Sequence, residues 1–382
     1  YSLTADRGPA DVTNSQAIIT SYSPYRPFTS IQESGLYIKE LENSELTYEK
    51  KHELNIGADM GFLNNRINLA VDWYKRNNYD LIGIVNTQGA GGQILKYANI
   101  ASMKSHGIEF TLSTKNIKTK DFNWNTDFIF SNAKNEVTDL KQNANVMELI
   151  SGNGFAKQGY PVRGLFSIPF VGLDKDGIPV IINEKGEATS TDINFQERQN
   201  TGFLKYEGPT DPTITGSLGN MFSYKGFRLN LFITYSFGNV IRLNPVFKAY
   251  YSDLTAMTRE FKNRWTLPGD EAKTNVPAIL SKRMYDSNED LKYAYNAYNY
   301  STERIAKGDF IRLKEISLAY DFPKAWINPL KLTDLSLKVQ ATNLFLIYAD
   351  DKLNGQDPEF FNAGGVASPV PRQFTITLRL GL

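Results

Sequence analysis

Acidic side chains gather in one segment near the end of the chain. Asp350, Asp351, Asp357 and Glu359 lie close together there, and paired carboxylates of this kind act as acid and base in glycoside hydrolases. The same side chains are also common in surface loops, where charge keeps the segment in water. We interpret the segment as a solvated loop and expect no catalytic residue in the chain.

Two further motifs resemble ligand-binding loops without completing them. "LDKDG" (Leu173 to Gly177) begins like a calcium loop, but Ile178 stands where an oxygen ligand is needed and no Glu completes the pattern. We therefore predict a β-turn at this position. "GAGG" (Gly89 to Gly92) lacks the Lys-Ser/Thr of a phosphate-binding loop, and we predict a mobile loop instead.

Metal and thiol chemistry have little support in the composition. Cysteine is absent and the two histidines are His52 and His106. Disulfides, Cys-ligated zinc and thiol catalysis are therefore excluded. Both histidines lie beside predicted strands, so we interpret them as structural and expect no metal site and no cofactor.

The segment "LKYAYNAYNYSTER" (Leu291 to Arg304) is rich in tyrosine. Tyrosine offers a flat face for sugar rings and a hydroxyl for hydrogen bonds, and it also suits protein interfaces. Packing within a loop explains these side chains equally well. The candidates for contact with a ligand or a protein partner are four tyrosines and two acids: Tyr293, Tyr295, Tyr298, Tyr300, Asp357 and Glu359.

Length and charge narrow the class of protein. The chain has 382 residues and a formal net charge of +1, which gives no excess of positive charge for binding nucleic acid.

No window approaches the ~18 consecutive apolar residues of a transmembrane helix, but a membrane barrel hides its apolar residues in alternation. "YSLTADRGP" opens the chain as if inside a strand, so we expect the C-terminal part of a longer polypeptide.

Alternation with a period of two recurs along the chain and predicts strands with one apolar and one polar face. Asn220 interrupts one apolar face, and Ile311 and Leu313 are out of phase with Ile316, which predicts a bulge near Lys314. We count roughly ten strands, each long enough to cross a bilayer when tilted. The clearest alternating runs lie near 54–60, 67–73, 108–112, 124–130, 214–224, 229–237, 316–320, 335–341 and 374–382.

The connections between the predicted strands are short and long in strict turn. Outer-membrane barrels have short periplasmic turns and long extracellular loops, and a sheet in lipid must close so that every backbone group is paired. The pattern therefore predicts an all-β fold, a transmembrane antiparallel β-barrel. The short connections lie near 62–66, 116–121, 224–227 and 322–333, and the long ones near 6–47, 85–104, 138–210, 238–307 and 349–370.

The two predicted faces of the strands differ in chemistry. Aromatic residues at the strand ends fit two membrane-interface girdles: Phe62, Tyr224, Phe227, Phe322 and Trp326 by the short turns, and Trp73, Tyr79, Tyr235, Phe237, Phe345 and Tyr348 by the long loops. Charges of both signs share the other face and fit a hydrated lumen with ion pairs between strands: Glu53, Asp59, Asp72, Glu109, Asp127, Arg228, Lys338 and Arg379.

Five separated blocks resemble, in the same order, the SusC/RagA family of TonB-dependent transporters. Ala101 stands where Gly is common in the family, and Leu382 ends the chain where an aromatic residue is usual. The blocks are "NSELTYEKKHELNIGADMGFLNNRINLAVDWYKRNNYDLI", "YANIASMKSHGIEFTLSTKNIKTKDFNWNTDFIFSNAKNEVTDL", "GDFIRLKEISLAYDFPKAWI", "NLF" followed by "GQDPE", and "PVPRQFTITLRLGL".

The resemblance implies an outer-membrane barrel of about 22 strands with a plugged lumen. Residues 1–382 would be the C-terminal portion of that one barrel domain, without the plug and the first strands. It also implies a non-enzymatic importer of oligosaccharides or oligopeptides, powered through the TonB complex. Its partners would be the N-terminal plug and barrel portion, the lipid bilayer and a SusD-like surface lipoprotein, a lid that the six candidate residues would help to contact. The alternatives are oligopeptide rather than glycan cargo, a passive or structural barrel, and a soluble glycan-binding or hydrolytic β protein.

Overall fold

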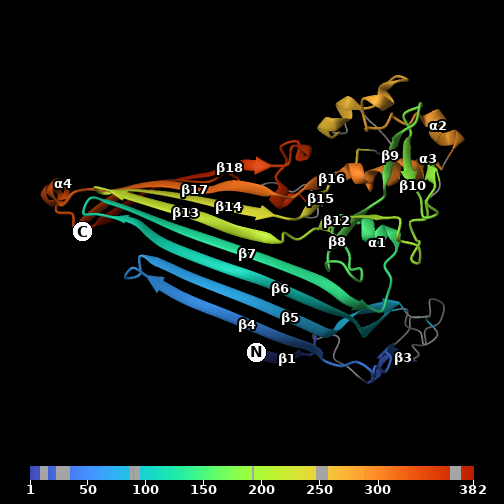
Figure 1. Ribbon diagram of the computed structural model, residues 1–382, viewed down its shortest axis with the longest axis horizontal. Coiled ribbons are helices and arrows are strands. Elements are labelled where there is room, and N and C mark those ends of the chain that lie inside the picture. The colour runs from blue at the N-terminus through green and yellow to red at the C-terminus, as the bar shows by residue number, and fades with distance from the viewer. Residues whose placement is uncertain are drawn as a thin grey trace, which may run out of the picture.

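One antiparallel sheet of ten strands dominates the molecule (Figure 1). The computed structural model describes residues 1–8, 16–22, 35–86, 89, 95–191, 193–246, 257–288, 290–361 and 371–382. Strands pair in chain order, as in a meander, and their number confirms the prediction of roughly ten. They are β1 (Ser2–Asp6), β4 (Glu49–Phe62), β5 (Ile67–Asn86), β6 (Leu95–Lys118), β7 (Phe122–Leu140), β13 (Ile214–Tyr224), β14 (Phe227–Phe237), β17 (Phe310–Asp321), β18 (Asp334–Ala349) and β19 (Gln373–Gly381).

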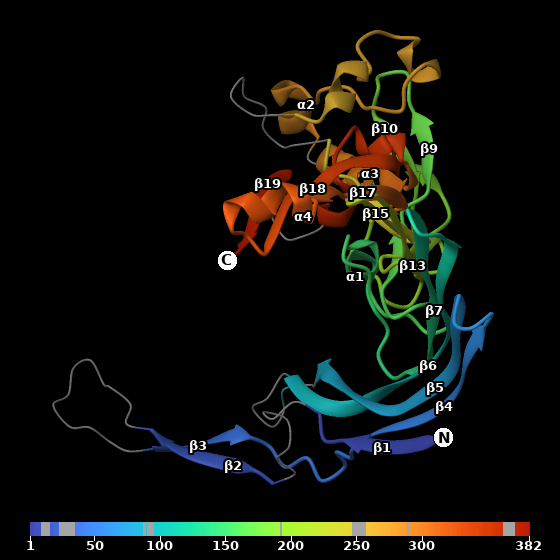
Figure 2. The same cartoon turned by 90° about the vertical axis from the view of Figure 1, so that its left-hand side faces the viewer.

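The sheet is strongly curved. Figure 2, which looks along the strands, shows it as an arc with one concave side, running from β1 and β4 round to β18 and β19. Neighbouring strands twist relative to one another, so a long sheet of this kind curls into the wall of a barrel. The arc is the shape expected of part of a barrel wall.

The alternation of connections is confirmed at most positions, but the long connection predicted near 85–104 is shorter than predicted, because β5 extends to Asn86 and β6 begins at Leu95. Short turns join β4 to β5, β6 to β7 and β13 to β14, and the connection from β17 to β18 carries α4 (Lys324–Ile327) and the 3-10 helix η5 (Asn328–Leu330). In the tightest turn Lys225 and Gly226 have φ angles of 43° and 90°, as a two-residue hairpin turn requires. Figure 1 shows α4 and the C-terminus at this end of the sheet and the long connections at the other.

The predicted bulge lies at Lys314. On β14, Phe232 is opposite Glu315, whereas the next residue, Ile233, is opposite Leu313. Lys314 is therefore the extra residue on β17, and it returns Leu313 to the face shared by Ile316. The phase error in the sequence is a real feature of the strand.

Asn220, the exception on an apolar face, has its own hydrogen-bonding partners. Its side-chain oxygen accepts hydrogen bonds from Trp124 Nε1 at 2.9 Å and from Thr126 Oγ1 at 2.7 Å, and Thr126 in turn accepts one from Asn116 Nδ2 at 2.7 Å. A polar group that faces hydrocarbon is tolerated when its hydrogen bonds are made internally. This network explains why the pattern is broken without loss of the strand.

Most of the large buried apolar side chains lie outside the ten-stranded sheet. Many apolar side chains of the sheet are exposed, among them Ile56 at 60% and Ile376 at 74%, as a lipid-facing surface requires. Exposed rings stand at both ends, such as Trp326 at the short turns and Tyr348 at the long loops, which fits two girdles. Among the described residues, no helix has the length and apolar character needed to cross a membrane.

Candidate functional site

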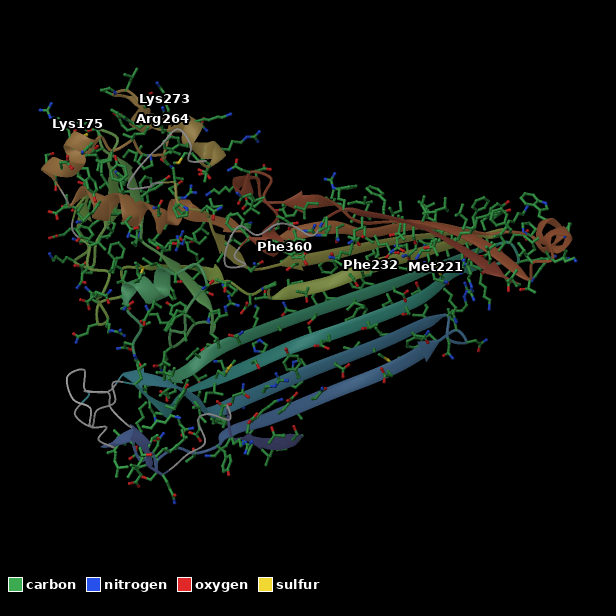
Figure 3. The ribbon with its side chains drawn as sticks, turned by 180° about the vertical axis from the view of Figure 1, so that it is seen from behind. Lys175, Met221, Phe232, Arg264, Lys273 and Phe360 are labelled. Atoms are coloured by element: carbon green, nitrogen blue, oxygen red, sulfur yellow. The ribbon has the colours of Figure 1, made fainter. Side chains whose placement is uncertain are left out.

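The long connections fold into a compact structure beyond one end of the sheet, which we call the loop assembly. It comprises the described residues of 141–213, 238–309 and 350–361 (Figures 1 and 3). A separate hairpin of β2 (Ile18–Tyr22) and β3 (Gly35–Glu40) belongs to the connection before β4. The elements of the loop assembly are α1 (Val146–Ile150), β8 (Gly164–Ser167), β9 (Phe170–Leu173), β10 (Pro179–Ile182), β11 (Ala188–Thr189), β12 (Lys205–Pro209), β15 (Val240–Arg242), η2 (Arg259–Asn263), η3 (Asp270–Ala272), α2 (Lys282–Ser287), α3 (Leu291–Asn299), η4 (Thr302–Arg304), β16 (Ile305–Lys307), η6 (Asp351–Leu353) and η7 (Pro358–Phe360).

The loop assembly has a hydrophobic core of its own. Its largest cluster joins α1 to β8 and to α3 through Leu149, Phe166 and Ala297. Asn145 starts α1 with a capping box, in which it and Glu148 bind each other's backbone N–H groups. Burial of a leucine or phenylalanine side chain, such as Leu149 or Phe166, contributes about 1.5–3 kcal/mol. These loops are therefore folded structure rather than solvated connections.

A buried arginine links three segments of the loop assembly. The Arg242 guanidinium donates to the carbonyl oxygens of Ser301 at 2.9 Å, Ile150 at 3.2 Å and Phe166 at 2.6 Å. Burial lowers the pKa of Arg242 to about 9, so it remains a cation at neutral pH. It satisfies carbonyl groups that would otherwise be buried without a donor.

Two more arginines form buried ion pairs. Arg304 pairs with Glu260 and also donates to the carbonyl oxygen of Asn244 at 2.7 Å. Arg312, on β17, lies 2.6 Å from Asp357 Oδ2 and 3.3 Å from a carboxylate oxygen of Glu359. The second pair joins β17 of the barrel wall to the acidic loop. Both members are buried: Arg312 is 5% exposed and the Asp357 side chain is 10% exposed.

The six candidate residues differ in their surroundings. Tyr295 and Tyr298 are each 1% exposed, whereas Tyr293 is 41% exposed and Tyr300 is half-buried. Asp357 is paired as described above, and Glu359 remains exposed beside it. Contact with a ligand or a partner stays a prediction for all six.

The burial of the tyrosines follows from a helix that sequence reasoning missed. Leu291, Ala294, Tyr295 and Tyr298 lie on the buried face of α3, with the i, i+3, i+4, i+7 spacing of an amphipathic helix. The expectation of a loop for this segment is therefore wrong for Leu291–Asn299. The i, i+3, i+4, i+7 spacing is the sequence signal that predicts this helix.

Two motifs that begin like ligand-binding loops are "LDKDG" at 173–177 and "GAGG" at 89–92. Asp174 Oδ1 accepts hydrogen bonds from the backbone N–H groups of Asp176 and Ile178, both at 2.9 Å, and Gly177 takes a φ of 75°. The predicted β-turn between β9 and β10 is confirmed. "GAGG" lies mostly outside the described residues. Among the residues described, no group of three or more His, Cys, Asp or Glu side chains is arranged to hold a metal ion.

Charged residues of the predicted interior face form ion pairs between strands. Arg76 on β5 lies 3.1 Å from Glu53 on β4, and Arg228 on β14 lies 2.9 Å from Asp321 on β17. Cross-strand pairs of opposite charge stabilise a sheet by roughly 0.2–1 kcal/mol each. These pairs fit the predicted hydrated face with both signs of charge. His52 packs its ring against Tyr79, with centroids 5.2 Å apart.

A small pocket lies beside α1, where the loop assembly meets the end of β7. It has a volume of about 110 Å³. Its wall combines one apolar floor with cationic and amide side chains: Leu140, Ala144 and Leu149, then Gln142, Asn143, Lys157, Gln158, Arg198, Gln199 and Thr201. No pattern in the sequence indicates this pocket, because its residues are scattered over three separate stretches.

A curved antiparallel meander with short turns at one end and folded loops at the other defines the class as a β-barrel of the outer-membrane type. No family model matches the chain. The chain is 25% identical over 368 residues to TonB-dependent receptor P3 of Formosa agariphila, covering 89% of this chain and 34% of that protein. It is 26% identical over 364 residues to TonB-dependent receptor SusC of Bacteroides thetaiotaomicron, covering 89% and 32%.

Solved structures share the fold. The RagAB peptide transporter matches with a TM-score of 0.74 at 24% identity, covering 99% of this chain and 39% of that chain. The RagAB peptide importer in its "open-open" state matches with a TM-score of 0.75 at 23% identity, covering 100% and 39%. The chain spans about a third of the length of the curated relatives it matches.

The relatives and the fold together support a SusC/RagA-type TonB-dependent transporter. They also place the chain in the outer membrane, as a sheet-rich segment of a β-barrel. The resemblance found in the sequence is confirmed. The relatives carry the names of receptors and transporters, not of enzymes.

Proposed function

We propose that this chain forms part of the wall and the outer loops of an active importer for oligosaccharides or oligopeptides. Residues 1–382 would be the C-terminal portion of its single barrel domain. The observation that carries the proposal is the loop assembly, a folded structure seated at one end of a curved, lipid-facing sheet (Figure 1).

Energy would come from the TonB complex, acting on a plug that belongs to the remainder of the transporter. A SusD-like lipoprotein would close the outer opening as a lid. The names of the relatives support this, since the relatives reported above are called TonB-dependent receptors. The chain itself would move its cargo without changing it chemically.

The six candidate residues would have two kinds of role: direct contact with the ligand or the lid, and support of the loops that carry these contacts. Tyr293 and Glu359 are exposed and would touch ligand or lid directly, and half-buried Tyr300 would present its edge. Tyr295 and Tyr298 would hold α3 in place, and Asp357 would hold its loop against β17. Tyrosine suits either contact, because it combines a large flat surface with a hydroxyl.

Uptake by cells tests the proposal. A strain that lacks the transporter gene would be compared with the wild type and with a strain lacking TonB, using fluorescently labelled oligosaccharide and oligopeptide mixtures. The proposal requires uptake of at least one mixture that depends on both the transporter and TonB. Uptake that persists without TonB would establish a passive pore instead.

The partner is tested in the same cells. The full-length transporter would be extracted in mild detergent with an affinity tag, and bound proteins identified by mass spectrometry. We expect a surface lipoprotein in equal amount. Extraction of the transporter alone, under conditions that preserve its fold, would remove the lid from the proposal.

A further inference from the structure

The pocket beside α1 contains a cation with an unusual environment. Lys157 Nζ lies 4.9 Å from the centre of the Phe166 ring and 5.7 Å from that of Tyr160, and it donates to Thr201 Oγ1 at 3.2 Å. Among the ion pairs of the described residues, none gives Lys157 a carboxylate partner. Its other partners are the two rings, this hydroxyl and the carbonyl oxygen of Thr201 at 3.5 Å, which are weaker partners than an anion.

Two of the three acids that directly precede pocket residues in the sequence are already engaged, and the third, Asp139, is exposed. Glu148 closes the capping box of α1 and lies 3.6 Å from Arg198. Glu197 accepts backbone N–H groups of Gln199 at 2.6 Å and Asn200 at 2.9 Å, which lowers the pKa of its carboxyl and keeps it ionised in that turn. Neither acid is among the residues that line the pocket.

Burial lowers the pKa of the Lys157 ammonium, because a partly desolvated charge is costly without a counter-ion. A bound anion would remove that cost. The pocket is also lined by Gln142, Asn143 and Gln199, whose side chains carry amide groups able to donate hydrogen bonds, and by apolar residues such as Leu140.

The geometry points to a binding site for a carboxylate group of the cargo in this pocket, with Lys157 as its charge partner. The inference rests on the proposed function and adds a chemical class to it. The carboxylate would come from a uronic acid of a glycan or from an acidic or C-terminal group of a peptide. The site would meet cargo near the outer opening, because α1 projects inside the arc of the sheet in Figure 2 and stands at the long-loop end of the strands in Figure 1.

Binding to the full-length transporter, purified in detergent, tests the inference by calorimetry. The probes are trigalacturonate and its methyl ester, and a tri-glutamate peptide and its fully amidated form. Lys157→Met removes the charge and keeps the apolar stem, and Lys157→Arg keeps the charge. Lys175→Met is the matched control, since Lys175 is exposed in the β9–β10 turn, at the outer end of the loop assembly in Figure 3.

We expect the wild type to prefer one carboxylate probe over its neutral form by about ten-fold, since one charge-assisted hydrogen bond is worth about that much. Lys157→Met abolishes the preference, while Lys157→Arg and Lys175→Met retain it. The probe that shows the preference identifies the source as glycan or peptide. Equal binding of charged and neutral probes by the wild type, or equal loss in Lys157→Met and Lys175→Met, would overturn the inference.

Uptake assays separate this inference from the proposed function. If Lys157→Met cells still import neutral cargo and lose only the carboxylate preference, both stand. If purified protein discriminates between the probes but no cargo enters cells in a TonB-dependent way, the importer proposal fails while the pocket assignment holds. If import proceeds and discrimination is absent, the pocket assignment alone fails.

Discussion

The ion pair between Arg312 and Asp357 should hold the acidic loop against the barrel wall, and its removal should release that loop. The Asp357 side chain is 10% exposed and lies 2.6 Å from the guanidinium. Removing one partner of a buried pair costs about 3–5 kcal/mol when the other charge stays buried alone. Glu359, which is exposed and 3.3 Å away, would remain beside Arg312, so we expect the lower end of that range. Asp357→Ala should therefore raise the opening equilibrium of residues 350–361 by about a hundred-fold or more.

A second pair with the same chemistry gives the control. Arg163 lies 2.7 Å from Asp211, but the two side chains are 49% and 53% exposed. Exposed pairs contribute about 0.2–1 kcal/mol, so Asp211→Ala should change local opening by at most about five-fold. The two predicted effects differ in size because the Arg312–Asp357 pair is buried, whereas the Arg163–Asp211 pair is exposed.

Hydrogen–deuterium exchange of the full-length protein measures the opening directly. Peptides covering 350–361 and 205–213 would be followed, with heat-dependent migration on gels as the check that the barrel is intact. Arg312→Met combined with Asp357→Leu should exchange more slowly than Asp357→Ala, since neither charge is left unpaired. Similar changes in Asp357→Ala and Asp211→Ala would refute the argument from burial.

Three further changes have defined outcomes. Asn220→Leu should lower the stability of the barrel by about 1–3 kcal/mol in refolding experiments, because Trp124 Nε1 and Thr126 Oγ1 lose their acceptor, whereas Met221→Leu should be nearly neutral; an equal effect of the two would contradict the network. Gly177→Ala should raise proteolysis near the β9–β10 turn, because the added Cβ would lie 2.5 Å from the Trp265 ring at a φ of +75°, and unchanged cleavage would count against this packing. The Trp265 indole N–H donates to Glu271 at 2.9 Å and so lowers the pKa of that carboxyl below 4.5. The bond is complete above pH 4.5 and is lost as the pH falls through the lowered pKa. A change of fluorescence in acid should therefore be present in the wild type and missing in Glu271→Gln.

The sequence by itself determined the barrel wall. Strand periodicity involves residues two apart, and the length of each connection is read directly from the chain. The ten strands, the alternation of short and long connections and the bulge at Lys314 are therefore local properties. Even the exception at Asn220 was visible, although its partner Trp124 lies 96 residues away.

Only the tertiary structure decided the chemistry of the loop assembly. Arg242 binds carbonyl groups of residues 92 and 76 positions away in the chain, and Lys157 meets Thr201 across 44 residues. Such contacts depend on how separate connections pack together, and no local period records that packing. Tyr295 and Tyr298 show the consequence: their composition suggested a binding surface, whereas the core beneath α3 buries both rings.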